Sequence, residues 1–234
     1  FFTNVAHEIR TPLTLIKSPL ENVLTSAQVS EEIRDDLKIM DQNTNRLLDL
    51  VNQLLDFRKT ETKGFQLDFV ECDITSLLRM TYTRFTPFAR QRGLDFTLDV
   101  PDDIYASVDK EGLTKIVSNL FTNAVKYAET YIRAKLLCED TLLQFTVCND
   151  GEVIPPDIRE DIFKPFVQYK RGSLQSVSGT GIGLALARSL AELHGGTLRM
   201  DQSADCNCFV LTLPVKHSQT ITALESEDFF PLLE

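Results

Sequence analysis

Apolar residues recur at three- and four-residue steps along the N-terminal quarter of the chain, which is the spacing of one face of a helix. In segment 1–27 the spaced apolar positions are Phe2, Val5, Ile9, Ile16, Leu20 and Val23. After the polar turn 25–30, a second segment repeats in heptads through Ile33, Leu37, Met40, Thr44, Leu47, Val51 and Leu54. Ser30 is expected to cap this second helix. The pattern predicts two helices joined by a short turn, an antiparallel hairpin.

The second helix has more apolar surface than one partner helix can cover. Beyond its heptad positions it carries Leu48, Leu50, Leu55 and Phe57. A second copy of the hairpin would cover this surface, so we expect a dimeric four-helix bundle. The alternative is a hairpin that packs on the following domain of its own chain, but the length of the apolar stripe favours the dimer.

A polar stretch that ends in Gly64 indicates a hinge after the hairpin. Beyond it, strand-like alternation is expected over 65–70, 94–100, 104–108, 131–137, 142–148, 197–202 and 209–213. Helical periodicity is expected over 74–92, 110–127 and 182–193. The two kinds of element do not alternate strictly, which favours an α+β sandwich. The expected division is a hairpin (1–60), a hinge (61–64), a second domain (65–216) and a tail (217–234).

Composition narrows the function classes. The 34 acidic residues outnumber the 24 basic ones, and a net charge of −10 argues against a general surface for nucleic acid or anionic membranes. No apolar run approaches the roughly 18 residues of a membrane span. The five cysteines are odd in number and widely scattered, which is typical of reduced thiols. Cys206 and Cys208 are too close in sequence for the usual zinc spacing, so no metal is expected there.

The first helix carries a histidine beside an acid, in the run Val5-Ala6-His7-Glu8-Ile9-Arg10-Thr11-Pro12. His7 lies off the apolar stripe, Glu8 flanks it, and Thr11 shares its face one turn later. An imidazole oriented by a carboxylate can act as a nucleophile near neutral pH. Pro12 is expected to bend the helix just after His7. An isolated histidine is more often an ordinary surface residue, so the motif needs a group for His7 to attack.

Three features of the second domain could supply that group. Asn119, Asn123 and Lys126 share one helix face, where amide oxygens suit Mg²⁺ and an ammonium suits phosphate. The run 149–156 follows an apolar strand, where a polar side chain beside a glycine can reach a base edge. The run Gly179-Thr180-Gly181-Ile182-Gly183-Leu184 opens a helix, where free amides favour phosphate. Taken singly, the first two are better explained as an ordinary polar helix face and an ordinary turn, and the glycine-rich run alone is a weak signal. All three in this order behind the His-Glu helix are a strong one.

With these motifs the chain resembles the catalytic core of a sensor histidine kinase. That family has a dimerisation and phosphoacceptor hairpin followed by an ATP-binding domain of the Bergerat fold, also called the GHKL type. The resemblance covers about residues 1–215, and the first twelve are also similar to the hybrid two-component sensors of Bacteroides-like bacteria. The matching segments are 7–12 for the H-box, 119–127 for the N-box, 147–155 for the G1 box, 163–166 for the F-box and 179–184 for the G2 box.

The resemblance implies an ATP- and Mg²⁺-dependent protein histidine autokinase. His7 would attack the γ-phosphorus in line, with Glu8 orienting the ring and accepting its proton. The phosphoryl group would then pass to an Asp of a response-regulator receiver domain. Thr11 would position water for a second activity, dephosphorylation of the receiver. The implied partners are a second copy of the chain and the receiver domain, with no nucleic acid.

The resemblance also implies a nucleotide site, in which Asn119 and Asn123 would hold the metal and Tyr127 would lie against the base. The implied nucleotide-binding set is Asn119, Asn123, Lys126, Tyr127, Asn149, Asp150, Gly151, Phe163, Phe166, Lys170, Arg171, Gly179, Thr180, Gly181, Ile182, Gly183 and Leu184. The family's G1 box usually reads Asp-x-Gly-x-Gly, whereas Asn149 and Val153 occupy its first and last positions here. We prefer Asn149 as the adenine contact, with Asp150 as the alternative after a one-residue shift.

Two further interpretations stay open at this point. The chain could be a degenerate nucleotide-binding dimeric scaffold that relays a conformational signal without autokinase activity, which the altered G1 box favours and the intact His7 opposes. An ATPase or clamp protein with the same nucleotide fold would have no use for the His-Glu helix. Because the chain begins inside an expected helix, we interpret it as the cytoplasmic portion of an inner-membrane sensor, with membrane contact only through regions N-terminal to it.

Overall fold

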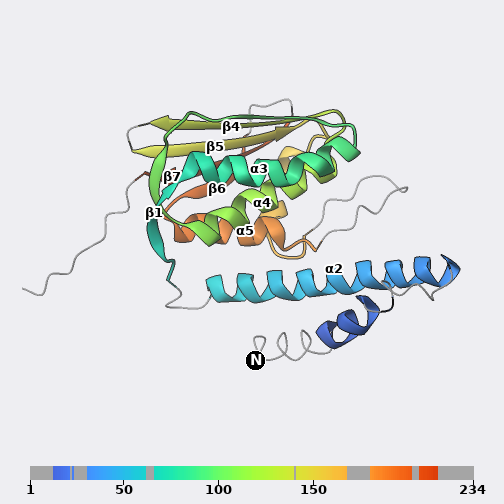
Figure 1. Ribbon diagram of the computed structural model, residues 1–234. Helices are drawn as coiled ribbons and strands as arrows, with labels where there is room; N and C mark the ends of the chain where they lie inside the picture. Colours follow the sequence, from blue (N-terminus) through green and yellow to red (C-terminus); the bar gives the residue numbers. More distant parts are fainter. Residues whose placement is uncertain are drawn as a thin grey trace, which may run out of the picture.

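The computed structural model describes residues 13–21, 23, 31–61, 66–139, 141–167, 180–201 and 206–215. The predictions for His7, Glu8, Thr11, Lys170, Arg171 and Gly179 lie outside the described residues. Residues 13–21 are helical, and helix α2 spans Glu31–Glu61. Leu13 packs with Val51 and Leu55 in the C-terminal half of α2, as an antiparallel pair requires. Figure 1 shows the short helix alongside α2. Of the described helices, none combines the length and the hydropathy of a membrane span.

The second domain has one mixed sheet with three helices on one of its faces (Figure 1). Its described elements are β1 Phe69–Asp73, α3 Ile74–Gln91, β2 Asp95–Asp99, β3 Tyr105–Asp109, α4 Lys110–Tyr127, β4 Tyr131–Glu139, β5 Leu142–Asn149, the short 3₁₀ helices η1 Pro156–Ile158 and η2 Asp161–Phe163, α5 Gly183–Leu193, β6 Thr197–Met200 and β7 Asn207–Pro214. The sheet order is β2-β4-β5-β7-β6, with β2 parallel to β4 and the other neighbours antiparallel. β1 and β3 form a separate antiparallel pair. This arrangement is the α+β sandwich expected from the sequence.

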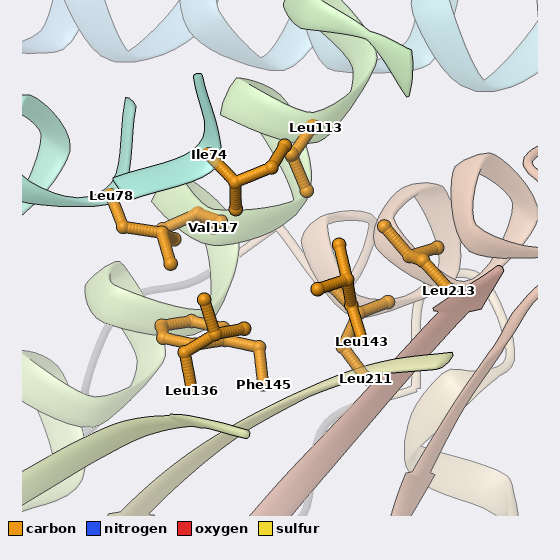
Figure 2. A pocket seen from close by; sticks show the side chains of 9 residues that line it. All are labelled: Ile74, Leu78, Leu113, Val117, Leu136, Leu143, Phe145, Leu211 and Leu213. Atoms are coloured by element: carbon orange, nitrogen blue, oxygen red, sulfur yellow. The ribbon is translucent and has the colours of Figure 1, made fainter. Parts of the chain in front are cut away.

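The core lies between the sheet and helices α3, α4 and α5. Phe121 of α4 is fully buried, and its ring centroid lies 5.7 Å from Phe85, 5.1 Å from Phe96 and 6.0 Å from Phe145. Figure 2 shows nine apolar side chains around a cavity of about 10 Å³ between the layers. That volume is about one water molecule, and an apolar cavity of this size stays dry. The space between the helices and the sheet is therefore filled by packed side chains and has no room for a ligand. A ligand must bind at the edge of the sandwich.

Aspartate caps explain why two helices begin where the sequence predicts. The Asp73 carboxylate accepts a 2.8 Å hydrogen bond from the Ser76 N–H, and Asp109 accepts one of 2.7 Å from Gly112. The first strand, by contrast, begins at Phe69 rather than at residue 65. The strand pairing decides this, because the pairing of β1 with β3 begins at Phe69, opposite Asp109.

The two parts of α2 differ in how much of their apolar surface is covered within the chain. Phe57 is buried in the core of the second domain, so the C-terminal part packs on its own chain. The heptad residues Ile33, Met40 and Leu47 remain exposed at 55%, 57% and 47%. Large exposed apolar positions in a regular row indicate a surface that binds a partner.

The expectation of reduced thiols is wrong for one pair of cysteines. Cys148 of β5 and Cys208 of β7 lie directly opposite each other, with their Cα atoms 4.1 Å apart, and a disulfide joins them. Cys72, Cys138 and Cys206 are free. The pairing was not visible in the sequence because 60 residues separate the two cysteines, and only the β5–β7 register brings them together.

Candidate functional site

The predicted site residues converge where α4 ends, β5 ends and α5 begins. Helix α4 buries one face in the core and leaves Asn119 and Asn123 half-buried on its flank. The Asn119 Oδ1 atom lies 3.0 Å from the position that a Cβ on Gly183 would occupy. Glycine at the first position of α5 thus lets the G2 segment approach the amide that is predicted to hold a metal.

Lys126 and Tyr127 lie together at the C-terminal end of α4. The Lys126 Nζ donates a 2.7 Å hydrogen bond to the Tyr127 hydroxyl and lies 4.5 Å from the ring centroid. Tyr127 is exposed. An accessible aromatic face beside an ammonium group suits a planar base and a phosphate.

Asn149, the last residue of β5, is buried and incompletely satisfied. Its side chain is 2% exposed, and its Nδ2 has no hydrogen-bond partner among the described residues. An unpaired buried amide costs about 1–3 kcal/mol, and such groups need an explanation when they persist in a fold. Nδ2 lies 3.0 Å from the position that a Cβ on Gly151 would occupy. The amide therefore faces space that only glycine at 151 leaves open.

The segment 151–154 is held by Asn207, a residue that sequence reasoning missed. The Asn207 Nδ2 donates to the carbonyl oxygens of Gly151 at 3.2 Å and Glu152 at 2.8 Å. Its Oδ1 accepts from the Ile154 N–H at 2.9 Å. Asn207 is 3% exposed and lies directly opposite Asn149 in the sheet. The only signal in the sequence was an asparagine next to the apolar strand 209–213, which by itself resembles a turn residue.

Asp150 connects β5 to the loop between α4 and β4. Its carboxylate accepts from the backbone N–H groups of Glu129 at 3.0 Å, Thr130 at 2.9 Å and Tyr131 at 3.1 Å, and from the Thr130 hydroxyl. Desolvation opposes ionisation, but the hydrogen bonds from Thr130, Tyr131 and Glu129 outweigh it and hold the pKa of Asp150 well below its usual range. The carboxylate is thus already occupied, which favours Asn149 over Asp150 as a base contact.

Replacing Asp150 with Asn is expected to lower the free energy of unfolding by about 1 kcal/mol at pH 7. The expected loss is this small because solvent reaches the carboxylate and weakens its charged hydrogen bonds. Since the folded-state pKa is depressed, the stabilisation is complete above the ordinary value of about 3.9 and is lost as the pH falls below it. In urea unfolding, the stability difference between variant and wild type should be constant from pH 7 to about pH 5 and should begin to narrow towards pH 3. The exposed Asp157→Asn is the control, and a difference that is equal at every pH would contradict the assignment.

The F-box and G2 segments meet through their backbones. The Phe166 N–H donates a 2.8 Å hydrogen bond to the Gly181 carbonyl, and a Cβ on Gly181 would lie 2.8 Å from the Phe166 Cα. Gly181 has a φ of +70°, which glycine adopts without strain. Phe166 is 64% exposed, whereas Phe163 is buried, with its ring 6.2 Å from Phe209. Of the two predicted phenylalanines, only Phe166 presents its ring at the surface.

Helix α2 contacts the site directly. The Thr180 hydroxyl donates a 2.8 Å hydrogen bond to Gln53 and accepts one of 3.2 Å from the Ile182 N–H. Lys115 of α4 lies 2.8 Å from the Asp56 carboxylate and 2.7 Å from Glu111. Burial opposes the charge on Lys115, but the hydrogen bonds to both acids outweigh burial and raise the pKa of its ammonium group. The start of the G2 helix is thus linked to the hairpin by polar contacts.

Comparisons with known proteins agree with this geometry. The family described as "Histidine kinase-, DNA gyrase B-, and HSP90-like ATPase" matches residues 108–217, and the "His Kinase A (phospho-acceptor) domain" matches residues 1–63. The hybrid signal transduction histidine kinase D of Dictyostelium discoideum is 32% identical over 92% of this chain and 14% of that protein. The sensor histidine kinase WalK of Bacillus subtilis is 30% identical over 94% of this chain and 37% of that protein.

A solved structure extends the comparison to the whole arrangement. Full-length ShkA in complex with AMPPNP has a TM-score of 0.79 and 26% identity, and the match covers 91% of this chain and 45% of that one. The chain spans less than half the length of each of these relatives. With a phospho-acceptor segment followed in order by the ATPase domain, the chain belongs to the histidine kinase family and comprises a histidine kinase catalytic core.

Proposed function

We propose that this chain is an ATP-dependent protein histidine autokinase that phosphorylates His7. The observation that carries the proposal is the amide nitrogen of Asn149, which is buried beside Gly151 without a hydrogen-bond partner. The domain that contains Asn149 follows a phospho-acceptor segment in the chain. An asparagine amide presents one acceptor and one donor, the pattern that pairs with an adenine edge. Asn149 can therefore bind adenine even though it lacks the charge of the family's usual aspartate.

The remaining nucleotide contacts follow from the positions around Asn149. Tyr127 would lie against the base, and Asn119 and Asn123 would hold Mg²⁺ through their amide oxygens. The amides of residues 181–183 at the start of α5, with Lys126, would hold phosphate. The sequence resemblance adds Lys170, Arg171 and Gly179 to this proposed set.

His7 performs the chemistry in this proposal. ATP would supply the phosphoryl group, and Mg²⁺ held by Asn119 and Asn123 would offset the negative charge of the phosphates. A nitrogen of the His7 ring attacks the γ-phosphorus, a nitrogen–phosphorus bond forms, and the bond to the leaving ADP oxygen breaks. Glu8 orients the ring and accepts its proton. Thr11 would position a water molecule for a second activity, the dephosphorylation of a receiver domain.

The proposed partners are a second copy of this chain and a response-regulator receiver domain. The exposed heptad residues Ile33, Met40 and Leu47 are the surface through which the second copy would pack. The receiver's Asp would accept the phosphoryl group from His7. Because ATP is available inside the cell, we propose that this portion of the protein lies in the cytoplasm.

The test of the function is incubation of the chain with γ-labelled ATP and Mg²⁺. Acid-labile label is expected in wild type and in His217→Ala, and none above background in His7→Ala. His217 is the matched control because it is a histidine in the tail. A wild-type chain that binds ATP but takes up no label would instead support the degenerate scaffold.

Asn149→Ala is expected to weaken nucleotide binding about 10- to 100-fold, because a bidentate base contact contributes about 1–3 kcal/mol. Asn149→Asp should retain binding, since its carboxylate still accepts from the adenine amino group. Titration with a fluorescent ATP analogue measures both. A larger loss in Asp150→Ala than in Asn149→Ala, at equal folded fraction, would overturn the choice of Asn149.

A further inference from the structure

Three sulfur atoms lie together beside the site, on β5, on β7 and on the residue just before β7. The disulfide joins Cys148 and Cys208, and the free Cys206 Sγ lies 3.5 Å from the Cys208 Sγ. All three sulfur atoms lie within 4.8 Å of one another. Cys148 and Cys206 are partly exposed, so small thiols in solution can reach them.

The cysteines are adjacent in sequence to both asparagines of the site. Cys148 precedes Asn149, and Asn207 lies between Cys206 and Cys208. Since the Asn207 side chain holds segment 151–154 through three hydrogen bonds, the position of its backbone sets the shape of that loop. A change in which sulfur atoms are bonded must move the peptide units on either side of Asn207.

We propose that Cys148, Cys206 and Cys208 form a thiol–disulfide exchange site that controls the shape of the adenine loop. The predicted effect on nucleotide affinity rests on the function proposed above, whereas the thiol–disulfide exchange itself does not. The Cys206 thiolate attacks the Cys208 sulfur, and a Cys206–Cys208 bond forms. The electron pair of the broken bond leaves with Cys148, which takes up the proton that Cys206 released. The step is redox-neutral and needs no external oxidant.

Tyr131 provides a hydrogen-bonding hydroxyl beside the Cys206 sulfur. The negative charge of Cys206 raises the pKa of the Tyr131 hydroxyl, and a hydrogen bond between the two acts in the same direction. Tyr131 therefore keeps its proton and can donate it in a hydrogen bond to the thiolate. Tyr131 begins β4, beside the loop that Asp150 holds.

The product of the exchange closes a small ring around Asn207, the first residue of β7. Cys206 lies in a bend just before the strand, and a disulfide holds two Cα atoms within about 6.8 Å of each other. Bonding Cys206 to Cys208 therefore reshapes the backbone around Asn207. The hydrogen bonds from Asn207 to Gly151 and Glu152 are then strained or lost, and the exchanged form is expected to bind nucleotide less tightly.

The first test locates the disulfide without reference to nucleotide. Peptide mapping by mass spectrometry under non-reducing conditions, after incubation at pH 8.5 without oxidant, is expected to find both Cys148–Cys208 and Cys206–Cys208 links. Cys206→Ser should retain only the first link, and the exposed Cys138→Ser should behave as wild type. Finding only Cys148–Cys208 in wild type would overturn the exchange. Zinc retained at one equivalent by reduced wild type, but not by Cys206→Ser, would also overturn it in favour of a metal site.

The second test measures the coupling. Oxidised Cys148→Ser, which can form only the Cys206–Cys208 link, is expected to bind a fluorescent ATP analogue about tenfold more weakly than oxidised Cys206→Ser. Dithiothreitol should make the two variants equal. Equal affinities in the oxidised forms, with the mapped links in place, would overturn the coupling. Absence of binding in every state, including reduced wild type, would instead refute the nucleotide function and leave the mapping result intact.

Discussion

Gly151→Ala is expected to abolish measurable nucleotide binding, with a loss of affinity of about 100-fold or more, and to lower the free energy of unfolding by about 1–3 kcal/mol. A Cβ at this position would lie 1.9 Å from the Tyr127 carbonyl oxygen and 2.9 Å from its carbon. Both are backbone atoms at the end of α4, so no side-chain rotation relieves the overlap. The new methyl group would also lie 3.0 Å from the Asn149 Nδ2, in the space that this amide faces.

The measurement combines titration of a fluorescent ATP analogue with urea unfolding of the same samples. Glu152→Ala is the matched control, because its side chain is exposed and only its backbone carbonyl is held by Asn207. The control should bind nucleotide as wild type does. A Gly151→Ala protein with wild-type affinity and stability would show that this loop does not lie against α4 when nucleotide binds, and the proposed site would be wrong.

Phe121→Ala is expected to have the largest effect on stability, a loss of about 3–5 kcal/mol in the free energy of unfolding. The ring is fully buried and contacts three other phenylalanines from α3, β2 and β5 edge-on. Removing it leaves a cavity between α4, its neighbour α3 and the sheet. Because the predicted metal-binding face belongs to the same helix, nucleotide binding should weaken along with stability.

Urea unfolding followed by circular dichroism measures this prediction, with the slope against urea concentration checked for two-state behaviour. Phe88→Ala is the control: Phe88 also lies on α3 near Phe85, but its side chain is 58% exposed. The control should change stability by less than about 1 kcal/mol. A loss in Phe121→Ala no greater than that of the control would mean that the core is not organised around this ring.

The limits of the expected helices were close to those observed because their causes are local in sequence. Asp73 and Asp109 mark the starts of α3 and α4 by accepting N–H groups three residues later. The first strand was placed four residues too early, since its start depends on pairing with β3 rather than on its own alternation. The cysteine interpretation failed for a similar reason, because the disulfide needs the β5–β7 register.

Some features of the candidate site could likewise be predicted from the sequence, and others only from the structure. The order of motifs, the three G2 glycines and the asparagines of α4 were recognisable from the chain alone. The sequence favoured Asn149 over Asp150 by alignment alone, and the structure adds a physical reason: the Asn149 amide nitrogen is buried without a partner, whereas the Asp150 carboxylate accepts from three backbone N–H groups. Asn207 carried no usable signal, because its function depends on a loop more than fifty residues earlier in the chain.

By itself, then, the sequence determined the elements, their order and the kind of chemistry, because periodicity, caps and glycine spacing act over a few neighbouring residues. Only the tertiary structure decided which half of α2 is buried, which polar group faces the space beside Gly151, and which cysteines are bonded. Those outcomes depend on contacts between segments far apart in the chain, and the geometry of such contacts is set by strand register and helix packing.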